Sequence, residues 1–455
     1  MIHFLELLYF LLLLQAGLRC LYFWQLKEYR LDRFKDFLTT SQRSQFFLPT
    51  RWFLRPKLTL KVFLLIYLSL YFSFILLSFK PQVIFILIAY FGMPITVSLA
   101  VLLLKPLTDL ITDMIIFLAK LKLTLMPKSL TVIGITGSFG KTSTKEILAH
   151  LLAAKYSVCK TKETNNTAIG VALTILKQLN SSHQYFIVEM GAYKIGEIKK
   201  ICRLVKPKIA VITGITSQHL SLFGGFDNII KAKSELLDAL PPKSLALFNG
   251  DNLTTRCLAK TYPHLNTLFY TYPKKPFKTN LLGDYQQLNL QAAVLLSQKL
   301  HLPLKIIKTR LAAIPAFKTM MVKKSGIKQS QIIDDSYNAN PEGFLQAIEF
   351  VNQLEYPRKI LITSGIIELG QDSHRIHHQI ALKARPVFSY VFVTKPEVYQ
   401  YFRPVFTAAP DQLINAANPQ ILFKTLKPLL NSQTVVLLAS RLPPPFIHSL
   451  CQNRS

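Results

Sequence analysis

A glycine-rich stretch near residue 137 carries the clearest chemistry in the sequence. A β-branched run at 131–135 leads into it, and a helix-forming segment follows. A strand, a tight turn and a helix in this order point backbone N–H groups and the positive helix end at phosphate oxygens. Lys141 would reach the β- and γ-phosphates, and the Thr142 hydroxyl would bind Mg²⁺. The predicted nucleotide-binding residues here are Gly137, Ser138, Gly140, Lys141, Thr142 and Ser143.

The loop departs from the usual G-x-x-x-x-G-K-[ST] spacing, because position 135 is Ile and the first glycine is Gly137. A short G-x-x-G-K-T string can arise by chance in a turn before a helix. Its position directly after a strand favours a nucleotide site.

Six further blocks follow this loop along the chain. They are TNNTAIGVALTIL (164–176), FIVEMGAYKIGEI (186–198), ITGITSQHLSLFGGFDNIIKAKSELL (212–237), LFNGDN (247–252), LLGDYQQLNLQAAVLL (281–296) and IIDDSYNANPEG (332–343). With ITGSFGKTSTKE (135–146), this ordered set resembles the Mur ligases. It is most similar to the branch of that family that joins D-alanyl-D-alanine to UDP-MurNAc-tripeptide.

The resemblance implies an α/β fold with a P-loop ATP-binding Mur ligase central domain at 128–316 and a Rossmann-like Mur ligase C-terminal domain at 317–455. The composition of the preceding residues, and not the resemblance, predicts a membrane region at 1–127. After Pro315, strand patterns alternate with helix patterns at 341–353 and 375–385, which independently favours a second parallel sheet.

The resemblance also implies a metal site with two Mg²⁺ ions. Glu189, at the end of an apolar strand, and His219, beyond the strand at 209–215, would bind metal together with Thr142. Lys233 matches a lysine that reacts with CO₂ in several Mur ligases and then binds the second ion as a carbamate. A carbamate requires a lysine of lowered pKa, which burial supplies. Lys231, two residues earlier, leaves this assignment open.

Substrate contacts follow from the resemblance in the same way. Asn165 and Asn166 would lie near the γ-phosphate and the acyl substrate, and Asn289 would contact adenine. The predicted ATP and amine contacts of the C-terminal domain are Asp335, Asn338 and Asn340. The chain departs from the family at Tyr285-Gln286, where His-Asn is usual, at Lys318, where an Arg is common, and at 438–441, where Lys-Gly-Ser-Arg is reduced to Leu-Ala-Ser-Arg.

The implied activity is an ADP-forming ligation in peptidoglycan precursor synthesis, in which a carboxylate is activated as an acyl phosphate and an amino acid or dipeptide is added. Mur ligases usually begin with a soluble domain that binds the UDP-sugar, and apolar segments stand in its place here. The acceptor is therefore either UDP-MurNAc-tripeptide or a lipid-linked precursor. A non-catalytic ATP-binding scaffold is a further alternative. An ATPase that drives transport is disfavoured, because the three apolar segments of the chain carry no buried charge and would form a poor transport pathway.

Three apolar segments, at 2–24, 62–79 and 83–104, have the composition of membrane spans. No basic region precedes the first segment and no A-x-A-like site follows it, which disfavours a cleaved signal peptide. Nine basic residues lie between the first two spans, so the positive-inside rule places this loop in the cytoplasm and the N-terminus outside. The sequence thus predicts a multi-pass protein of the cytoplasmic (inner) membrane with cytoplasmic catalytic domains.

Residues 105–127 form an amphipathic stretch that either lies along the membrane surface or is a fourth packed helix or a linker. The formal charge of +30 sits largely beside apolar segments, so anionic lipids are a better partner than nucleic acid, for which no recognition motif is present. The five cysteines are scattered singly, which disfavours disulfides or a zinc site. The sequence contains no feature that indicates the oligomeric state.

Overall fold

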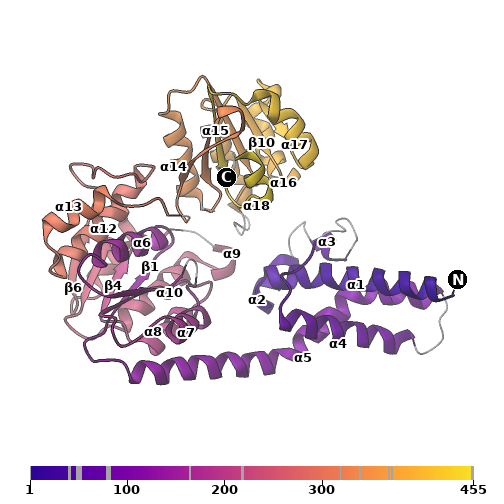
Figure 1. The fold of residues 1–455 in the computed structure, drawn as a ribbon, viewed down its shortest axis with the longest axis horizontal. Coiled ribbons are helices and arrows are strands. Elements are labelled where there is room, and N and C mark those ends of the chain that lie inside the picture. Colours follow the sequence, from indigo (N-terminus) through magenta and orange to yellow (C-terminus); the bar gives the residue numbers. More distant parts are fainter. Residues whose placement is uncertain are drawn as a thin grey trace. The chain divides into compact units, whose positions relative to one another are not determined.

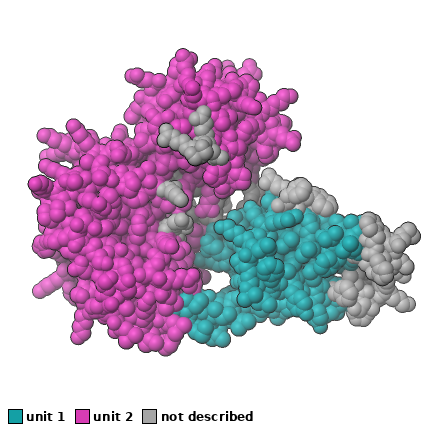
Figure 2. All heavy atoms as spheres, viewed as in Figure 1, with its two compact units in different colours: residues 1–115 teal, residues 116–455 magenta. Residues whose placement is uncertain are grey.

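The computed structural model describes residues 2–38, 43–47, 54–77, 83–162, 165–216, 220–317, 319–337, 340–366, 369 and 372–451. They form two compact units, residues 1–115 and residues 116–455, which Figure 2 colours separately. The first unit is helical, and the second contains two six-stranded sheets (Figure 1).

Helices build the first unit, and most of them are apolar. They are α1 (Ile2–Leu26), α2 (Leu31–Leu38), α3 (Ser44–Phe47), α4 (Leu60–Leu77) and α5 (Val83–Thr124), whose residues after 115 belong to the second unit. Gly17 lets α1 approach α4 closely, because a Cβ there would lie 2.8 Å from Ile66 Cδ1. The Trp24 ring stacks on Phe34 with centroids 3.7 Å apart, and its Nε1–H donates to Ser98 Oγ of α5 at 3.1 Å. Close packing and an indole hydrogen bond therefore hold α1 against its neighbours.

Helix α5 is longer than the sequence analysis predicted. A span ending at 104 and a separate amphipathic segment were expected, but residues 83–124 form one helix of 42 residues, about 63 Å at 1.5 Å per residue. Pro94 and Pro106 lie inside it. Each proline removes a single backbone donor, and the Leu-rich sequence around them favours the helix strongly enough to continue through both.

The first sheet belongs to the predicted ATP-binding domain and is fully parallel. Its strands are β1 (Thr131–Thr136), β2 (Val158–Lys160), β3 (Tyr185–Glu189), β4 (Ile209–Ile212), β5 (Leu245–Asn249) and β6 (Asn266–Tyr270), in the order β2-β3-β1-β4-β5-β6. β1 pairs with both β3 and β4, with Ile135 opposite Glu189 and opposite Val211. Ligands of such sheets bind at the carboxyl ends of the strands, so β1, β3 and β4 bring their following loops together.

Helices cover both faces of this sheet (Figure 1). They are α6 (Lys141–Leu152), α7 (Ala168–Lys177), α8 (Glu197–Val205), α9 (Leu220–Phe223), α10 (Phe226–Asp238), α11 (Leu253–Lys260), α12 (Tyr285–Lys299) and α13 (Leu304–Ala312). α6, α12 and α13 bury their apolar side chains in one core with the β-branched residues of the sheet. The strands are buried on both sides, which explains their nearly continuous apolar sequences.

The second sheet forms the predicted C-terminal domain. Its strands are β7 (Val322–Ser325), β8 (Gln331–Asp335), β9 (Arg358–Thr363), β10 (Tyr390–Val393), β11 (Leu413–Asn415) and β12 (Thr434–Ala439), in the order β11-β10-β9-β12-β8-β7. Only the edge strand β7 is antiparallel. Its helices are α14 (Pro341–Asn352), α15 (Ser373–Ala384), α16 (Pro396–Phe402), α17 (Pro419–Leu426) and α18 (Pro444–Leu450). Two apolar clusters lie on its two faces. The predicted second α/β sheet is confirmed, and it is parallel except for β7.

Candidate functional site

Two glycines shape the loop between β1 and α6. Gly137 has φ 153° and Gly140 has φ 74°, conformations that L side chains rarely adopt. A Cβ on Gly137 would lie 2.1 Å from Thr213 Oγ1, and one on Gly140 would lie 2.5 Å from Asn289 Oδ1. Both positions therefore require glycine, and the loop closes tightly enough to present its backbone N–H groups.

The loop after β4 holds the glycine-rich loop in place. The Ser138 N–H donates to Gly214 O at 2.6 Å, and the Ser138 hydroxyl donates to Thr216 O at 3.1 Å. Thr213 Oγ1 donates to Phe139 O at 2.5 Å. The sequence analysis missed Thr213, because its role depends on β4 lying beside β1.

Lys141 starts α6 and folds back over the loop. Its Nζ donates to Gly137 O at 2.7 Å and to Ser138 O at 3.1 Å. Burial lowers the pKa of Lys141, and the negative charge of Glu189 opposes this shift. A cation held against the loop in this way is available to an anionic ligand of the loop.

Glu189, at the end of β3, lies next to Thr142 as predicted. Its Oε2 accepts from Thr142 Oγ1 at 2.9 Å, and its Oε1 accepts from Asn166 Nδ2 at 3.2 Å. The carboxylate is almost fully buried. Lys145, which the sequence analysis missed, also contacts it, with Nζ 3.1 Å from Oε2. Its position one turn after Lys141 on the same helix face was the available signal.

A hollow opens beside this cluster. It is lined by Gly137, Ser138, Lys141, Asn166, Gly191, Ala192, Tyr193, Phe223, Ile229 and Lys233. The structure distinguishes the two candidate lysines of α10, because Lys233 is buried at the hollow and Lys231 is exposed. Burial and the positive charge of Lys141 lower the pKa of Lys233 to about 7. A large share of this amine is therefore neutral near pH 7 and able to act as a nucleophile toward CO₂.

The remaining predicted residues of this domain differ in their surroundings. Asn166 lines the hollow, whereas its neighbour Asn165 is exposed and donates its N–H to Lys162 O at 2.8 Å. Asn289 is buried against the glycine-rich loop, where its Oδ1 accepts from Thr144 Oγ1 at 3.4 Å. Ser143 is half-buried on α6. The adenine contact of Asn289 stays a prediction.

In the C-terminal domain, two predicted residues lie at the carboxyl end of β8 and just beyond it. Asp335 ends the strand and is buried. Asn340 caps α14, since its Oδ1 accepts from the Gly343 N–H at 2.7 Å. Asn338, His219 and Lys318 lie outside the described residues.

The donor set fits a nucleotide with a hard divalent cation. The glycine loop, Lys141 and the start of α6 suit phosphate oxygens, and the Thr142 hydroxyl and Glu189 carboxylate are the oxygen donors that Mg²⁺ prefers. Among the described residues, no group of three His, Cys, Asp or Glu side chains is arranged around a metal.

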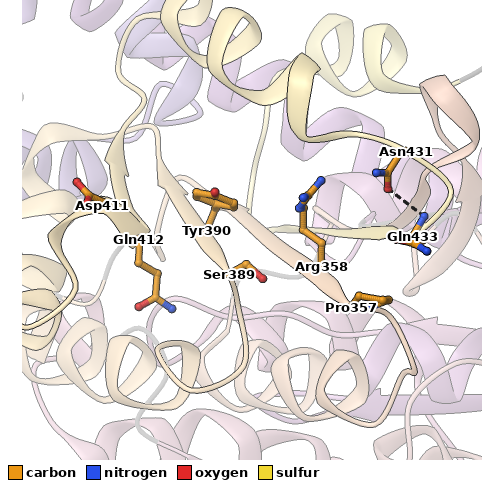
Figure 3. Close-up of a pocket in the computed structure, with 8 residues that line it drawn as sticks. All are labelled: Pro357, Arg358, Ser389, Tyr390, Asp411, Gln412, Asn431 and Gln433. Carbon is orange, nitrogen blue, oxygen red and sulfur yellow. Dashed lines mark hydrogen bonds between the residues drawn. The ribbon is translucent and has the colours of Figure 1, made fainter.

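A second hollow lies in the C-terminal domain (Figure 3). Its lining residues are Pro357, Arg358, Ser389, Tyr390, Asp411, Gln412, Asn431 and Gln433. Arg358 and Tyr390 begin β9 and β10, so this hollow is at the amino edge of the sheet, opposite the edge where such folds bind ligands.

Comparison with known families matches both sheet-bearing domains. Residues 135–292 match the Mur ligase middle domain, and residues 320–442 match the Mur ligase, glutamate ligase domain. Together these ranges make up more than half of the chain. The matched middle domain starts within β1 and contains the glycine-rich loop, Glu189 and every residue that lines the hollow beside them.

Two curated relatives carry the name UDP-N-acetylmuramoyl-tripeptide–D-alanyl-D-alanine ligase. That of Buchnera aphidicola (subsp. Acyrthosiphon pisum) is 31% identical over 277 residues, which cover 55% of this chain and 60% of the relative. That of Escherichia coli K12 is 27% identical over 281 residues, 56% of this chain and 62% of the relative. The chain thus spans about three-fifths of the length of these relatives.

Solved structures show the same fold. The MurF ligase from Thermotoga maritima in complex with ADP superposes with a TM-score of 0.63 at 28% identity, covering 72% of this chain and 80% of that protein. MurF from Acinetobacter baumannii gives a TM-score of 0.64 at 23% identity, with 74% and 80% covered, which supports the fold alone.

Proposed function

The chain belongs to the Mur ligase family, and on that premise we propose that it is an ATP-dependent, ADP-forming ligase that joins D-alanyl-D-alanine to UDP-MurNAc-tripeptide. Relatives with this name are similar over 277 and 281 residues, and both domains match models of the family. The product would be a precursor of peptidoglycan.

One observation carries the proposal. The glycine-rich loop, the ammonium of Lys141, the Thr142–Glu189 pair and the buried Lys233 surround or adjoin one hollow at the carboxyl edge of the first sheet. Phosphoryl transfer needs positioning and charge neutralisation more than covalent help, and these groups supply both.

In the first step, a carboxylate oxygen of the acceptor attacks the γ-phosphorus of ATP. A new C(O)–O–P bond forms, the bond from the γ-phosphorus to the bridging oxygen breaks, and ADP leaves. Lys141 and the loop N–H groups would hold the phosphates in line and neutralise developing charge. Mg²⁺, held by Thr142 and Glu189 and in the prediction also by His219 and carbamylated Lys233, would add positive charge at the phosphate oxygens.

In the second step, the amine nitrogen of the dipeptide attacks the activated carbonyl carbon. The C–N bond forms, the C–O bond to phosphorus breaks, phosphate leaves and the amine proton passes to solvent. Asn166 is proposed to orient the acyl group, and its place in the lining of the hollow and its hydrogen bond to Glu189 support this role. Asp335, Asn338 and Asn340 of the C-terminal domain are proposed to position ATP and the amine, with water excluded from the acyl phosphate.

The test is ADP release by the detergent-solubilised full chain with Mg²⁺ and bicarbonate. Turnover is expected only when UDP-MurNAc-tripeptide and D-alanyl-D-alanine are both present. The exposed Lys231 provides a matched control, so Lys233→Ala should lose turnover and Lys231→Ala should keep it. Turnover that is unaffected by Lys233→Ala, or that needs neither substrate, would contradict the proposal.

A lipid-linked acceptor is the second candidate, and the helical first unit favours it. An apolar unit of 115 residues occupies the place where a UDP-sugar domain is usual in the family. The same assay with the tripeptide on a lipid-linked carrier in detergent separates the two acceptors. ATP binding without turnover on either acceptor would instead support a non-catalytic scaffold.

We also propose that the first unit anchors the chain in the cytoplasmic membrane with the catalytic domains in the cytoplasm. Two helical segments, Leu7–Leu26 and Leu87–Thr124, are long and apolar enough to cross a bilayer. In the most apolar stretch of each helix, 44% and 39% of the residues, respectively, are buried inside the protein. A core helix of a soluble protein would be mostly buried. The apolar part of α4 is shorter, Leu60–Ser73. The three-span topology with an external N-terminus stays a prediction.

Helix α5 exceeds the roughly 30 Å of a hydrocarbon core, so only part of it would cross the bilayer. Its C-terminal half exposes apolar residues at helical spacing, among them Leu110, Met114, Phe117 and Leu121. Anionic lipids would then interact with the apolar stripe and its flanking lysines. Carbonate extraction and protease treatment of spheroplasts test this anchor, with the C-terminal domain expected to resist protease from outside.

A further inference from the structure

Lys145 is a buried cation in the second turn of α6. Its side chain is fully buried, and it lies one turn after Lys141. Lysine is rarely buried completely unless it is paired, so its partners indicate its role.

Lys145 contacts two carboxylates. Its Nζ lies 3.1 Å from Glu189 Oε2 and 3.4 Å from Glu146 Oε1. Glu146 also pairs with Lys160, whose side chain is partly exposed. The four charges form a chain from the surface inward, Lys160–Glu146–Lys145–Glu189, and it ends on the predicted metal ligand.

The two lysines of α6 have different partners. Lys141 Nζ donates to carbonyl oxygens of the glycine-rich loop, whereas Lys145 Nζ donates directly to Glu189. Thr142 and Asn166 add neutral hydrogen bonds to the same carboxylate. Among the residues that the structure describes, Lys145 is thus the lysine whose ammonium pairs with Glu189. A buried carboxylate without a cation is strongly disfavoured.

We propose that Lys145 is the resident counter-ion of Glu189, which holds the carboxylate in place before a divalent cation binds and limits how tightly that cation binds. Lys145 is thus a positioning residue. The inference rests on the proposed function, since it takes Glu189 to be a Mg²⁺ ligand of an ATP-dependent ligase. Lys145 and the metal ion would both neutralise the negative charge of Glu189. Glu146 also attracts the Lys145 ammonium and so weakens its interaction with Glu189.

Two substitutions are expected to have opposite effects. Lys145→Met removes the charge and keeps much of the volume, so the site without metal loses its counter-ion and Mg²⁺ binds about tenfold more tightly. Glu146→Gln leaves the whole Lys145 charge to Glu189, so Mg²⁺ binds more weakly. Lys145→Arg keeps the positive charge, so its affinity for Mg²⁺ should stay close to that of the unmodified protein.

The experiment measures the melting temperature of the full chain in detergent with saturating ADP, across a Mg²⁺ titration. In EDTA, Lys145→Met should melt about 10 °C below the unmodified protein. Mg²⁺ should recover part of that loss, with its midpoint at a lower concentration. Glu146→Gln should move the midpoint to a higher concentration. Lys155→Met, an exposed lysine of the same domain that lies outside the chain of charges, is the control and should leave the midpoint unchanged.

Equal destabilisation of Lys145→Met with and without Mg²⁺, or an unchanged midpoint, would overturn the inference and leave Lys145 a packing residue. If Lys145→Met does not fold, the direction of the Glu146→Gln shift decides alone. Failure of the proposed function is distinguishable, because it appears as absent turnover of the unmodified protein in the ADP-release assay, whatever the Mg²⁺ midpoints of the variants are.

Discussion

Replacing Gly137 with alanine tests the geometry of the glycine-rich loop most directly. The new Cβ would lie 2.1 Å from Thr213 Oγ1 and 2.9 Å from Gly214 O, at a residue with φ 153°. The second neighbour is backbone and cannot rotate away. The loop must therefore move relative to the segment after β4, and its hydrogen bonds with that segment weaken.

The expected loss of stability in Gly137→Ala is the sum of two separate free-energy costs. A side chain at a disfavoured φ costs about 1–3 kcal/mol, and overpacking against fixed atoms costs about 1–3 kcal/mol more. For a domain of this size, one kcal/mol shifts the melting temperature by about 2–4 °C, so Gly137→Ala should lower it by about 10 °C. The affinity for ADP should fall as well, because the displaced N–H groups of the loop are the ones that would bind its phosphates.

Two other glycines provide matched controls in the same domain. Gly196 has φ 97° with nothing within 4 Å of its Cβ position, so Gly196→Ala carries the backbone cost without the clash. Gly225 is extended and equally open, so Gly225→Ala should be close to neutral. Thermal melting and fluorescent-ADP binding give both readouts. If Gly137→Ala melts like Gly225→Ala and keeps its ADP affinity, the packing of the loop described here is wrong.

Three further predictions follow from individual side chains. Because the pKa of Lys233 is lowered to about 7, carbamylation should be possible near neutral pH, and turnover in CO₂-depleted buffer should rise when bicarbonate is added; no response would argue against a carbamate. Burial lowers the pKa of His377 to about 4, and its Nε2 accepts from the Ile366 N–H at 2.9 Å. The native state thus excludes a proton that the unfolded chain accepts near pH 6.5, so stability should fall by up to about 3 kcal/mol as the pH drops from about 6.5 to 4. His377→Gln should flatten that part of a pH–melting curve, and an unchanged slope would contradict the assignment. Asn340→Ala should cost about 1 kcal/mol in a melting experiment through loss of the cap of α14, whereas Asn340→Asp should keep most of it.

Several features of the fold follow directly from local sequence. The β-branched run before Gly137 and the helix-forming residues after Lys141 predict β1, the loop and α6, because each depends on neighbours a few residues away. Strand and helix alternation likewise predicts two α/β sheets. Asn-Pro at 340–341 predicts the start of α14, since Asn caps helices and Pro is favoured at the first helical position.

Local pattern was less informative for the helical unit. Leu-rich sequence predicts helices, but it does not show whether Pro106 ends one. The structure continues α5 through that proline to Thr124.

By itself, the sequence determined which residue types surround the phosphate loop and in what order they follow. The tertiary structure decided which of them meet. Lys231 and Lys233 are alike in sequence context, and so are Asn165 and Asn166, but only one of each pair faces the hollow. Glu189 meets Thr142 and Lys145, more than forty residues away, because β3 pairs with β1. Burial and strand order are properties of the packed chain, so the charge partner of Glu189 and the lowered pKa of Lys233 could not be found from spacing alone.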